Sequence, residues 1–402
     1  MESLRTTCCI VGGGPAGMML GFLLARKGVE VMVLEKHKDF FRDFRGDTVH
    51  PSTLEVLYEL GILDQFLAMP HQEIRHIGAS IGGEDFAIAD TTRLPTHAKF
   101  VALMPQWDFL NFLGRQAAKY PNFSLKMEHN VTELVEGNGR VKGVRAETPA
   151  GLVEIRASLV IGCDGRHSTS RAAAHLRVAD HGAPIDVLWF RLSKHPSDPA
   201  AALGHVNYGA LIVLIDRGDY YQTAFIIAKG SFETVVKPAG LDAFRAHIVR
   251  IAPFLADRVA ELTDWAQVQL LSVQVNRLKR WHLPGLLCIG DAAHAMSPVG
   301  GIGINLAIQD AVAAANILAP PLAGGAMVTE LTLAHIQSRR EFPTRVTQGF
   351  QVFVHDFLGK VLDNPGPIEP PRLLKALRPG PWLQDKLARF IGMGVRPEHI
   401  RS

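Results

Sequence analysis

The stretch Gly12-Gly13-Gly14-Pro15-Ala16-Gly17 decides the fold of this 402-residue chain. An apolar run at 7–11 precedes it, an apolar helical pattern at 18–26 follows it, and a second apolar run at 30–34 ends at Glu35. In a dinucleotide-binding unit the first glycine makes a tight turn, the second lets the backbone approach a pyrophosphate, and the third lets the helix pack on the strand. Glu35, 18 residues after Gly17, stands where an acid binds a ribose. We therefore predict a Rossmann-type α/β domain.

Composition is that of an ordinary soluble enzyme. Hydrophobic residues make up 47% of the chain and charged residues 20%, and the net charge is +3. The sequence has no basic run with interleaved aromatic residues, so we expect no nucleic-acid partner. It also has no signal-peptide pattern and no stretch of about 18 uncharged apolar residues. These features predict a cytoplasmic protein with no obligatory membrane contact.

The four cysteines, Cys8, Cys9, Cys163 and Cys288, lie in apolar runs and form no C-x-x-C pair. We expect buried free thiols, with neither a disulfide framework nor a metal site.

Periodicity divides the chain into two kinds of segment. Strand and helix patterns alternate in the parts with glycine motifs, whereas 187–275 has longer alternating strands and a helix at 241–251. Further expected elements are helices at 51–60 and 105–118, a small β element within 73–94, a three-stranded meander within 131–156, separate strands at 159–162 and 286–289, and a helix at 304–318. After Pro320 we expect mostly helix with proline breaks.

Two later motifs bring aspartates to strand ends. Gly162-Cys163-Asp164-Gly165 follows a buried strand, and Ser168 is expected to cap the helix after it. Gly290-Asp291-Ala292-Ala293-His294 follows another strand, and the glycine-rich loop 296–303 then meets the helix at Ile304. An Asp-Gly turn alone indicates only a turn. The loop is more informative, because bare amides and a helix dipole suit an anion such as reduced flavin.

In this order and at these separations, the three motifs resemble those of the class A flavoprotein aromatic monooxygenases, the para-hydroxybenzoate hydroxylase-like family, over residues 5–350. The resemblance implies a Rossmann-type FAD-binding α/β domain, an inserted antiparallel-sheet substrate domain and a helical C-terminal part. The FAD-binding domain then comprises 1–72, 100–180 and 276–345, the substrate domain 73–99 and 181–275, and the C-terminal region 346–402.

The resemblance also assigns residues to FAD. Glu35 binds the adenosine ribose, the backbone of Val131 contacts adenine, and Gln106 touches the ribityl chain. Asp291 binds the ribityl or pyrophosphate part, and Asp164 serves FAD and the entry of the nicotinamide cofactor. The candidate catalytic residues are Pro298, beside the flavin ring, and Arg45, over the FAD. The remaining candidate cofactor-binding residues are Gly12, Gly14, Pro15, Ala16, Gly17, Lys36, Gly165, Gly301, Gly303, Ile304 and Asn305.

The implied reaction uses NADPH or NADH and O2, and a flavin hydroperoxide hydroxylates a small phenolic or heteroaromatic molecule. No cysteine or histidine is obviously placed for a flavin linkage, so FAD is expected to be non-covalent. Alternatives are a flavin-dependent reductase or halogenase of the same fold, and a non-catalytic flavin-binding protein. The sequence runs typical of tryptophan halogenases and geranylgeranyl reductases are missing, which favours the hydroxylase. Both a monomer and a homodimer stay open.

The substrate is expected to be apolar. The run 210–215 has no cation, so the carboxylate-anchoring arginine of the best-known family member has no counterpart in it. Leu211, Val213, Tyr221 and Phe225 are the candidate substrate residues, and Arg217, next to the run, is the main threat to this interpretation. His294 is expected to pack beneath the glycine-rich loop 296–303 rather than to catalyse, and the amphipathic stretch 349–362 is expected to pack on the protein itself.

Overall fold

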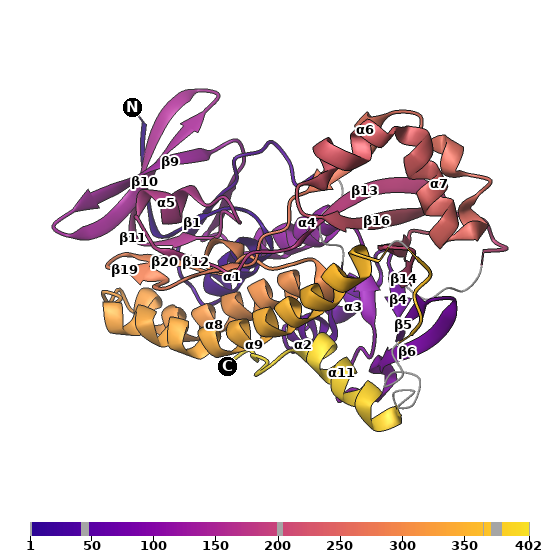
Figure 1. The fold of residues 1–402 in the computed structure, drawn as a ribbon. Helices are drawn as coiled ribbons and strands as arrows, with labels where there is room; N and C mark the ends of the chain where they lie inside the picture. The colour runs from indigo at the N-terminus through magenta and orange to yellow at the C-terminus, as the bar shows by residue number, and fades with distance from the viewer. Residues whose placement is uncertain (1, 42–47, 199–203, 365, 371–379, 402) are drawn as a thin grey trace.

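The computed structural model describes residues 2–41, 48–198, 204–364, 366–370 and 380–401 (Figure 1). Two large sheets dominate it. In Figure 1 the sheet that contains β1 lies at the left, the sheet that contains β13 and β16 lies at the right, and two long helices, α8 and α9, run beneath both.

The first sheet has the strand order β19-β20-β11-β1-β2-β8, with β10 and β9 continuing antiparallel from β11. Its strands are β1 (Glu2–Val11), β2 (Val31–Leu34), β8 (Phe123–Lys126), β9 (Asn130–Gly137), β10 (Arg140–Thr148), β11 (Gly151–Gly162), β19 (His282–Leu283) and β20 (Leu286–Cys288). The strands β20, β11, β1, β2 and β8 are parallel. Parallel strands are covered on both faces, which explains their continuous apolar runs.

The expected meander and the separate strand at 159–162 form one unit. The twelve-residue β11 pairs antiparallel with β10 through its first half and parallel with β1 along nearly its whole length. A single strand therefore belongs both to the meander and to the Rossmann core, and the break expected near 157–158 does not occur.

Helices and a small sheet complete this half. The helices are α1 (Pro15–Arg26), α2 (Pro51–Glu59), α3 (Leu63–Leu67), α4 (Gln106–Ala117) and α5 (Thr169–Ala173), and the small sheet joins β3 (Thr48–Val49), β7 (Val101–Leu103) and β4 (Gln72–Ile74). Helix α1 packs against both α4 and α8. The four cysteines are buried free thiols, as predicted.

The second sheet has the order β17-β13-β16-β15-β14-β5-β6. Its strands are β5 (His76–Ile81), β6 (Glu84–Asp90), β13 (Ile185–Ser193), β14 (Gly204–Asn207), β15 (Ala210–Asp216), β16 (Tyr220–Ala228) and β17 (Gln269–Leu271). The β5–β6 hairpin thus joins strands that lie more than a hundred residues later in the chain. On one face, α7 (Leu241–Ile251) closes a core rich in aromatic rings; the short α6 (Lys237–Ala239) precedes it, and β12 (Val178–Asp180) pairs with β18 (Asn276–Leu278).

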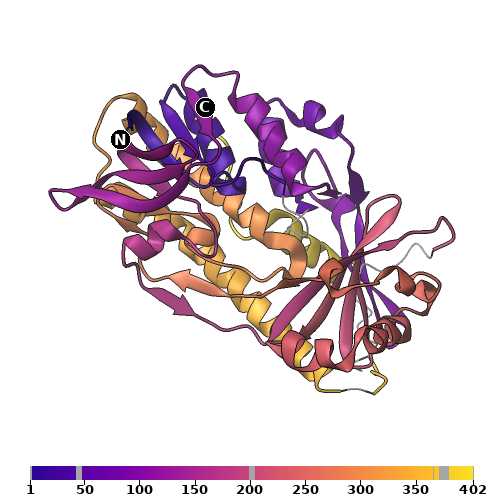
Figure 2. The same cartoon turned by 90° about the horizontal axis from the view of Figure 1, so that it is seen from above.

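The C-terminal helices are longer than the prolines led us to expect. They are α8 (Ile302–Ala323), α9 (Glu330–Leu362) and α11 (Pro381–Met393), and in Figure 2 the orange helices α8 and α9 run obliquely across the middle of the molecule. Helix α8 contains Pro320 and Pro321, and α9 contains Pro343. The first two lie in the final turn of α8, where few intrahelical bonds remain to be lost. The segment Val299–Ala323 is apolar and long enough to span a membrane, but 78% of its apolar window is buried inside the protein.

Candidate active site

The first glycine motif forms a tight turn, and at two of its positions only glycine fits. Gly12 has φ +106°, and a Cβ there would lie 2.4 Å from the carbonyl oxygen of Cys163. A Cβ on Gly17 would lie 2.0 Å from the carbonyl oxygen of Gly12. Gly14 differs, because a Cβ there would meet nothing within 4 Å. The structure thus reserves open space beside Gly14, where the pyrophosphate is expected.

Glu35 and the start of α1 meet at this turn. Pro15 is the first residue of α1, and no side chain caps the helix at Gly14. The Glu35 carboxylate accepts hydrogen bonds from the backbone N–H of Gly13 (3.0 Å) and of His37 (3.1 Å). The chain leading to Val131 lies alongside, since the N–H of His129 donates to the Glu35 carbonyl (2.9 Å). The proposed adenosine contacts therefore come together, with Lys36 exposed next to them.

Asp164 stabilises its own loop. Its carboxylate accepts from the Ser168 hydroxyl (2.5 Å) and from the N–H of Ser170 (2.8 Å), and Ser168 caps α5, as predicted. Around it, several buried polar atoms have no hydrogen-bond partner: Nη1 of Arg166, Nη1 of Arg171 and the Ser170 hydroxyl. Nη2 of Arg166 lies 3.5 Å from the Asp291 carboxylate. This edge of the first sheet therefore has donors to spare for an anionic ligand.

The third motif leads into the start of α8. Gly300 and Gly301 have φ of +77° and +63°, and no side chain caps α8 at Gly301. The carboxamide oxygen of buried Asn305 accepts from the hydroxyls of Ser52 (2.5 Å) and Thr53 (2.9 Å), in the first turn of α2. The start of α8 is thus fixed by α2, directly after the loop 297–301, which we call the flavin loop.

Helix α9 holds the other side of the flavin loop. The Gln351 amide donates to the carbonyls of Ser297 (2.9 Å) and Val299 (3.2 Å) and accepts from the N–H of Ser297 (3.1 Å). Nε2 of His355 lies 2.8 Å from the Ser297 hydroxyl. Sequence reasoning missed both residues, because nothing local marks a glutamine and a histidine 54 and 58 residues downstream of their partner.

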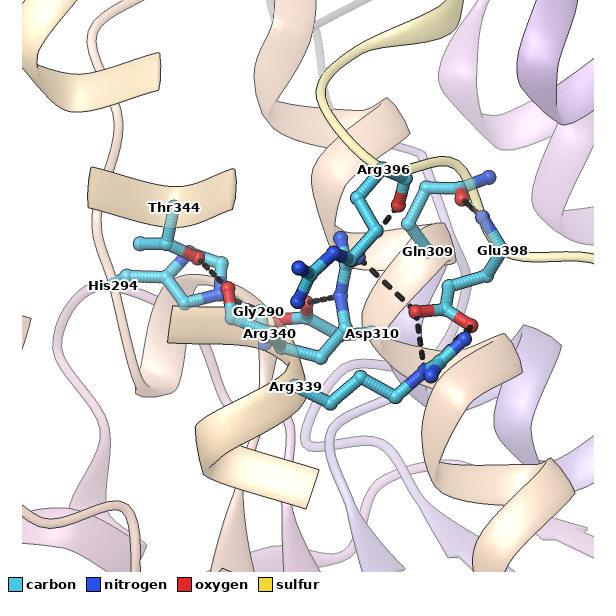
Figure 3. Close-up of polar contacts among 9 residues, drawn as sticks. All are labelled: Gly290, His294, Gln309, Asp310, Arg339, Arg340, Thr344, Arg396 and Glu398. Carbon is cyan, nitrogen blue, oxygen red and sulfur yellow. Dashed lines mark hydrogen bonds and ion pairs between the residues drawn. The ribbon is translucent and has the colours of Figure 1, made fainter. Parts of the chain in front are cut away.

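A buried charge network lies beneath the Gly290–Asp291 turn (Figure 3). The Asp310 carboxylate accepts from the N–H of Gly290 (3.1 Å), contacts Nε2 of His294 (2.5 Å) and accepts from Nε of Arg340 (2.9 Å). Arg340 also reaches the Glu398 carboxylate (3.4 Å), which is paired with Arg339 (2.8 Å). His294 is therefore buried beneath the Gly290–Asp291 turn that precedes the flavin loop, where it contacts Asp310. The only signal for this network was a lone acid, Asp310, in an apolar helical run.

The second sheet turns one apolar face towards the flavin loop. Leu211 and Val213 pack against the same cluster as Val299 of that loop, a cluster built from Ile185, Val187, Ala224, Ile226, Val273 and Leu358. Tyr221 and Phe225 lie on the opposite face, in the core beneath α7, where the Phe225 and Phe244 ring centroids are 5.1 Å apart. Side chains alternate along a strand, so these two cannot join Leu211 and Val213, and we remove them from the candidate substrate residues.

Other candidates have simpler positions. Gln106 begins α4 and is half-buried, and Pro298 precedes the turn at Val299–Gly301. Arg45 lies outside the described residues.

These features fit FAD. Two helices, α1 and α8, begin without a side-chain cap, and their first amides and dipoles suit a pyrophosphate and the pyrimidine edge of a flavin. The open space at Gly14 and the unpartnered donors of Arg166 and Arg171 lie at the same sheet edge. When bound, FAD would supply the redox and oxygen-activating chemistry. The chain itself supplies binding and orientation.

Comparison with known proteins agrees with this geometry. The FAD binding domain family matches residues 5–349. The chain is 31% identical to 6-methylpretetramide 4-monooxygenase from Streptomyces rimosus, over 79% of this chain and 76% of that protein. It is 23% identical to para-nitrophenol 4-monooxygenase from a Pseudomonas species, over 83% and 82%. The solved structure of the anhydrotetracycline hydroxylase OxyS from Streptomyces rimosus is similar, with a TM-score of 0.75, 22% identity, and coverage of 98% of this chain and 77% of that one. The chain is therefore an FAD-dependent oxidoreductase that belongs to the FAD binding domain family of para-hydroxybenzoate hydroxylase-like flavoprotein monooxygenases.

Proposed function

We propose that the protein hydroxylates a small aromatic compound with NADPH or NADH and O2, in the cytoplasm. The observation that carries this proposal is the apolar face of the second sheet, which packs together with Val299 of the flavin loop. A reaction in which a reduced flavin activates O2 for transfer of one oxygen atom to a ring needs a dry site, since water promotes loss of the oxidant as peroxide. Leu211 and Val213 would exclude water there, while Glu35 and the amides at the start of α1 would hold the dinucleotide.

The substrate is proposed to be uncharged and largely apolar. Leu211, Val213 and Ile215 share the flavin-side face of β15, and burying an unpaired carboxylate against them costs several kcal/mol. Arg217 borders this face. Its Nε and Nη2 both donate to the side-chain oxygen Oε1 of Gln222 (3.1 and 3.0 Å), and Gln222 pairs across the strands with Ile215. The positive charge is thus held at the rim of the apolar face.

Stopped-flow flavin reduction tests this polarity. Matched pairs of substrates, a neutral phenol and its carboxylated analogue, are compared with NADPH as reductant. We expect the neutral member to accelerate reduction more, and Arg217→Ala to leave that ranking unchanged. An advantage for the carboxylated member that disappears in Arg217→Ala would contradict the proposal and make Arg217 a carboxylate anchor.

The flavin reductase and halogenase alternatives predict different products from the same assay. A reductase consumes NADPH without adding oxygen to its substrate, and a halogenase requires halide. A non-catalytic flavin-binding protein would show no stimulation of NADPH oxidation by any aromatic compound. The mass of the product, its dependence on halide and the stimulation of NADPH oxidation therefore separate the hydroxylase, the reductase, the halogenase and the non-catalytic protein.

A further inference from the structure

The middle of helix α9 turns polar side chains inward. Between 340 and 355 its buried residues are mostly polar: Arg340, Thr344, Gln348, Gln351 and His355 are each at most 2% exposed. Its outward face is apolar, and Phe342 and Phe353 are 52% and 71% exposed. A helix on the surface of a soluble protein ordinarily turns its apolar stripe inward. In this middle stretch the inward face holds the flavin loop and the charge network, and apolar side chains lie outside, whereas Leu333, Ile336, Leu358 and Val361 pack inward near the two ends of the helix.

The outward residues form one continuous stripe. Phe342, Val346, Phe353 and Phe357 are all exposed, and at 3.6 residues per turn they fall within about 60° of the helix circumference. Helix α11 lies along one margin of this α9 stripe, where the Phe350 and Phe390 rings are 4.9 Å apart. A contiguous exposed apolar surface of this kind marks an interaction site.

The spacing of the α9 stripe is the same read from either end. The intervals between its four residues are 4, 7 and 4. If a second copy packs antiparallel, with the two-fold axis between Gly349 and Phe350, Phe342 lies opposite the partner's Phe357 and Val346 opposite the partner's Phe353. At the centre, a Cβ added to Gly349 would meet nothing within 4 Å, so the two backbones can approach closely. Such self-complementarity is what a two-fold interface requires.

Charge follows the same symmetry. Arg345 and Asp356 are both exposed and lie along the same flank of the α9 stripe. In an antiparallel helix pair, residues on the same flank of the two helices face each other. Arg345 then stands within about 3 Å, along the axis, of the level of the partner's Asp356. Each copy contributes one such pair, so the contact has two complementary ion pairs beside an apolar seam.

We propose that the α9 stripe is the contact surface of a homodimer in which two α9 helices pack antiparallel about Gly349. The occupant is a second copy of this chain, because the apolar spacing is the same in both directions along the helix and the flanking charges pair with their opposites across a two-fold axis. The polar inward face of each α9 stays in place, so dimerisation leaves the flavin loop contacts intact.

Disulfide trapping tests the register directly. The native cysteines are all buried, so Gly349→Cys introduces the only exposed thiol among the described residues. We expect this holoenzyme variant to form a reducible covalent dimer under mild oxidation. Leu331→Cys is the matched control: Leu331 is 83% exposed on the same side of α9, but the same axis pairs it with position 368, beyond the end of the helix. Equal cross-linking of the two variants would overturn the proposal.

Light scattering coupled to size exclusion supplies the second readout. The wild-type holoenzyme should have the mass of a dimer, and Phe353→Asp should weaken association by about tenfold or more. Arg345→Asp and Asp356→Arg should each weaken it, and the double exchange should restore it. Flavin absorbance, retained in every variant, confirms folding. A monomeric wild type would overturn the proposal. If that monomer also sedimented with phosphatidylcholine–phosphatidylglycerol vesicles while Phe353→Asp did not, the α9 stripe would be a membrane contact instead.

Discussion

At the scale of single residues, a methyl group has opposite consequences at two glycines of the first motif. Gly14 has ordinary extended backbone angles and open space around it, so Gly14→Ala should fold as stably as wild type without FAD. The added Cβ would occupy the approach of the pyrophosphate, and we expect the Kd for FAD to rise by about tenfold or more, about 1.4 kcal/mol. Fluorescence titration of apoprotein with FAD measures this.

Gly12→Ala is the contrasting variant. Its φ of +106° and the 2.4 Å approach to Cys163 oppose any side chain, so it should fail to fold rather than merely lose FAD. If Gly14→Ala bound FAD with wild-type affinity, the position assigned to the pyrophosphate would be wrong.

Asp310 stabilises the fold through charge. Burial alone raises the pKa of its carboxyl, but His294 and Arg340 outweigh that effect and hold the pKa below its usual 3.8. A carboxyl with a lowered folded-state pKa contributes stability above pH 3.8, and this is lost as pH falls through the folded value. Asp310→Asn should cost about 3–5 kcal/mol, because it leaves Arg340 short of a counter-charge in a buried site. Urea unfolding at pH 7 measures this loss of unfolding free energy. A loss below about 1 kcal/mol, the range of exposed ion pairs, would contradict a stabilising role for the buried charge network.

At the scale of elements, the inward face of α9 links the C-terminal half to the flavin loop. Gln351→Leu removes three hydrogen bonds to the backbone of the flavin loop: the glutamine side chain accepts one from Ser297 and donates one each to the carbonyls of Ser297 and Val299. We expect a loss of about 1–3 kcal/mol of stability, together with weaker FAD binding, because the loop is no longer fixed.

Gln337→Leu is the matched control on the same helix. Gln337 accepts from the N–H of Trp281 (2.9 Å) and donates to the Lys279 carbonyl (3.1 Å), away from the flavin loop. It should lower the melting temperature to a similar extent and leave the Kd for FAD unchanged. Equal effects of the two variants on FAD affinity would mean that α9 acts only through global stability.

Elements with a local signal could be predicted from the sequence. The turn at Gly12–Gly17, the helix Leu241–Ile251 and the cap at Ser168 depend on residues within a few positions of each other. Contacts between distant segments could not, since Glu398 reaches Arg340 and Gln351 reaches Ser297 without any shared pattern. The two faces of β16 were misassigned for a similar reason: alternation gives two faces, and only the packing of α7 decides which one is the core.

At the scale of the whole molecule, buried histidines should make the protein sensitive to mild acid. Burial lowers the pKa of His50 to about 4, and it also lowers the pKa of His205, His247, His282 and His355. The unfolded chain then binds more protons than the folded one. The stability contributed by neutral His50 is complete above pH 6.5 and is lost as pH falls towards its folded pKa of about 4, by up to about 1.4 kcal/mol per pH unit. The lowered pKa values of the other four histidines act in the same direction.

Melting temperatures between pH 7.5 and pH 5 test this, and His50→Asn should flatten the profile. A melting temperature that stays constant over that range, or that rises as pH falls, would contradict the assignment of neutral buried histidines.

With bound FAD, the enzyme is expected to use NAD(P)H and O2 to hydroxylate an aromatic ring. The most direct measurement is the reaction of the FAD-loaded enzyme with NADPH and 18O2 in the presence of aromatic compounds, with the product analysed by mass spectrometry. We expect a phenolic product that carries one 18O atom, formed with consumption of one NADPH and one O2. NADPH consumption that no aromatic compound stimulates, or a product whose new oxygen comes from water, would contradict it.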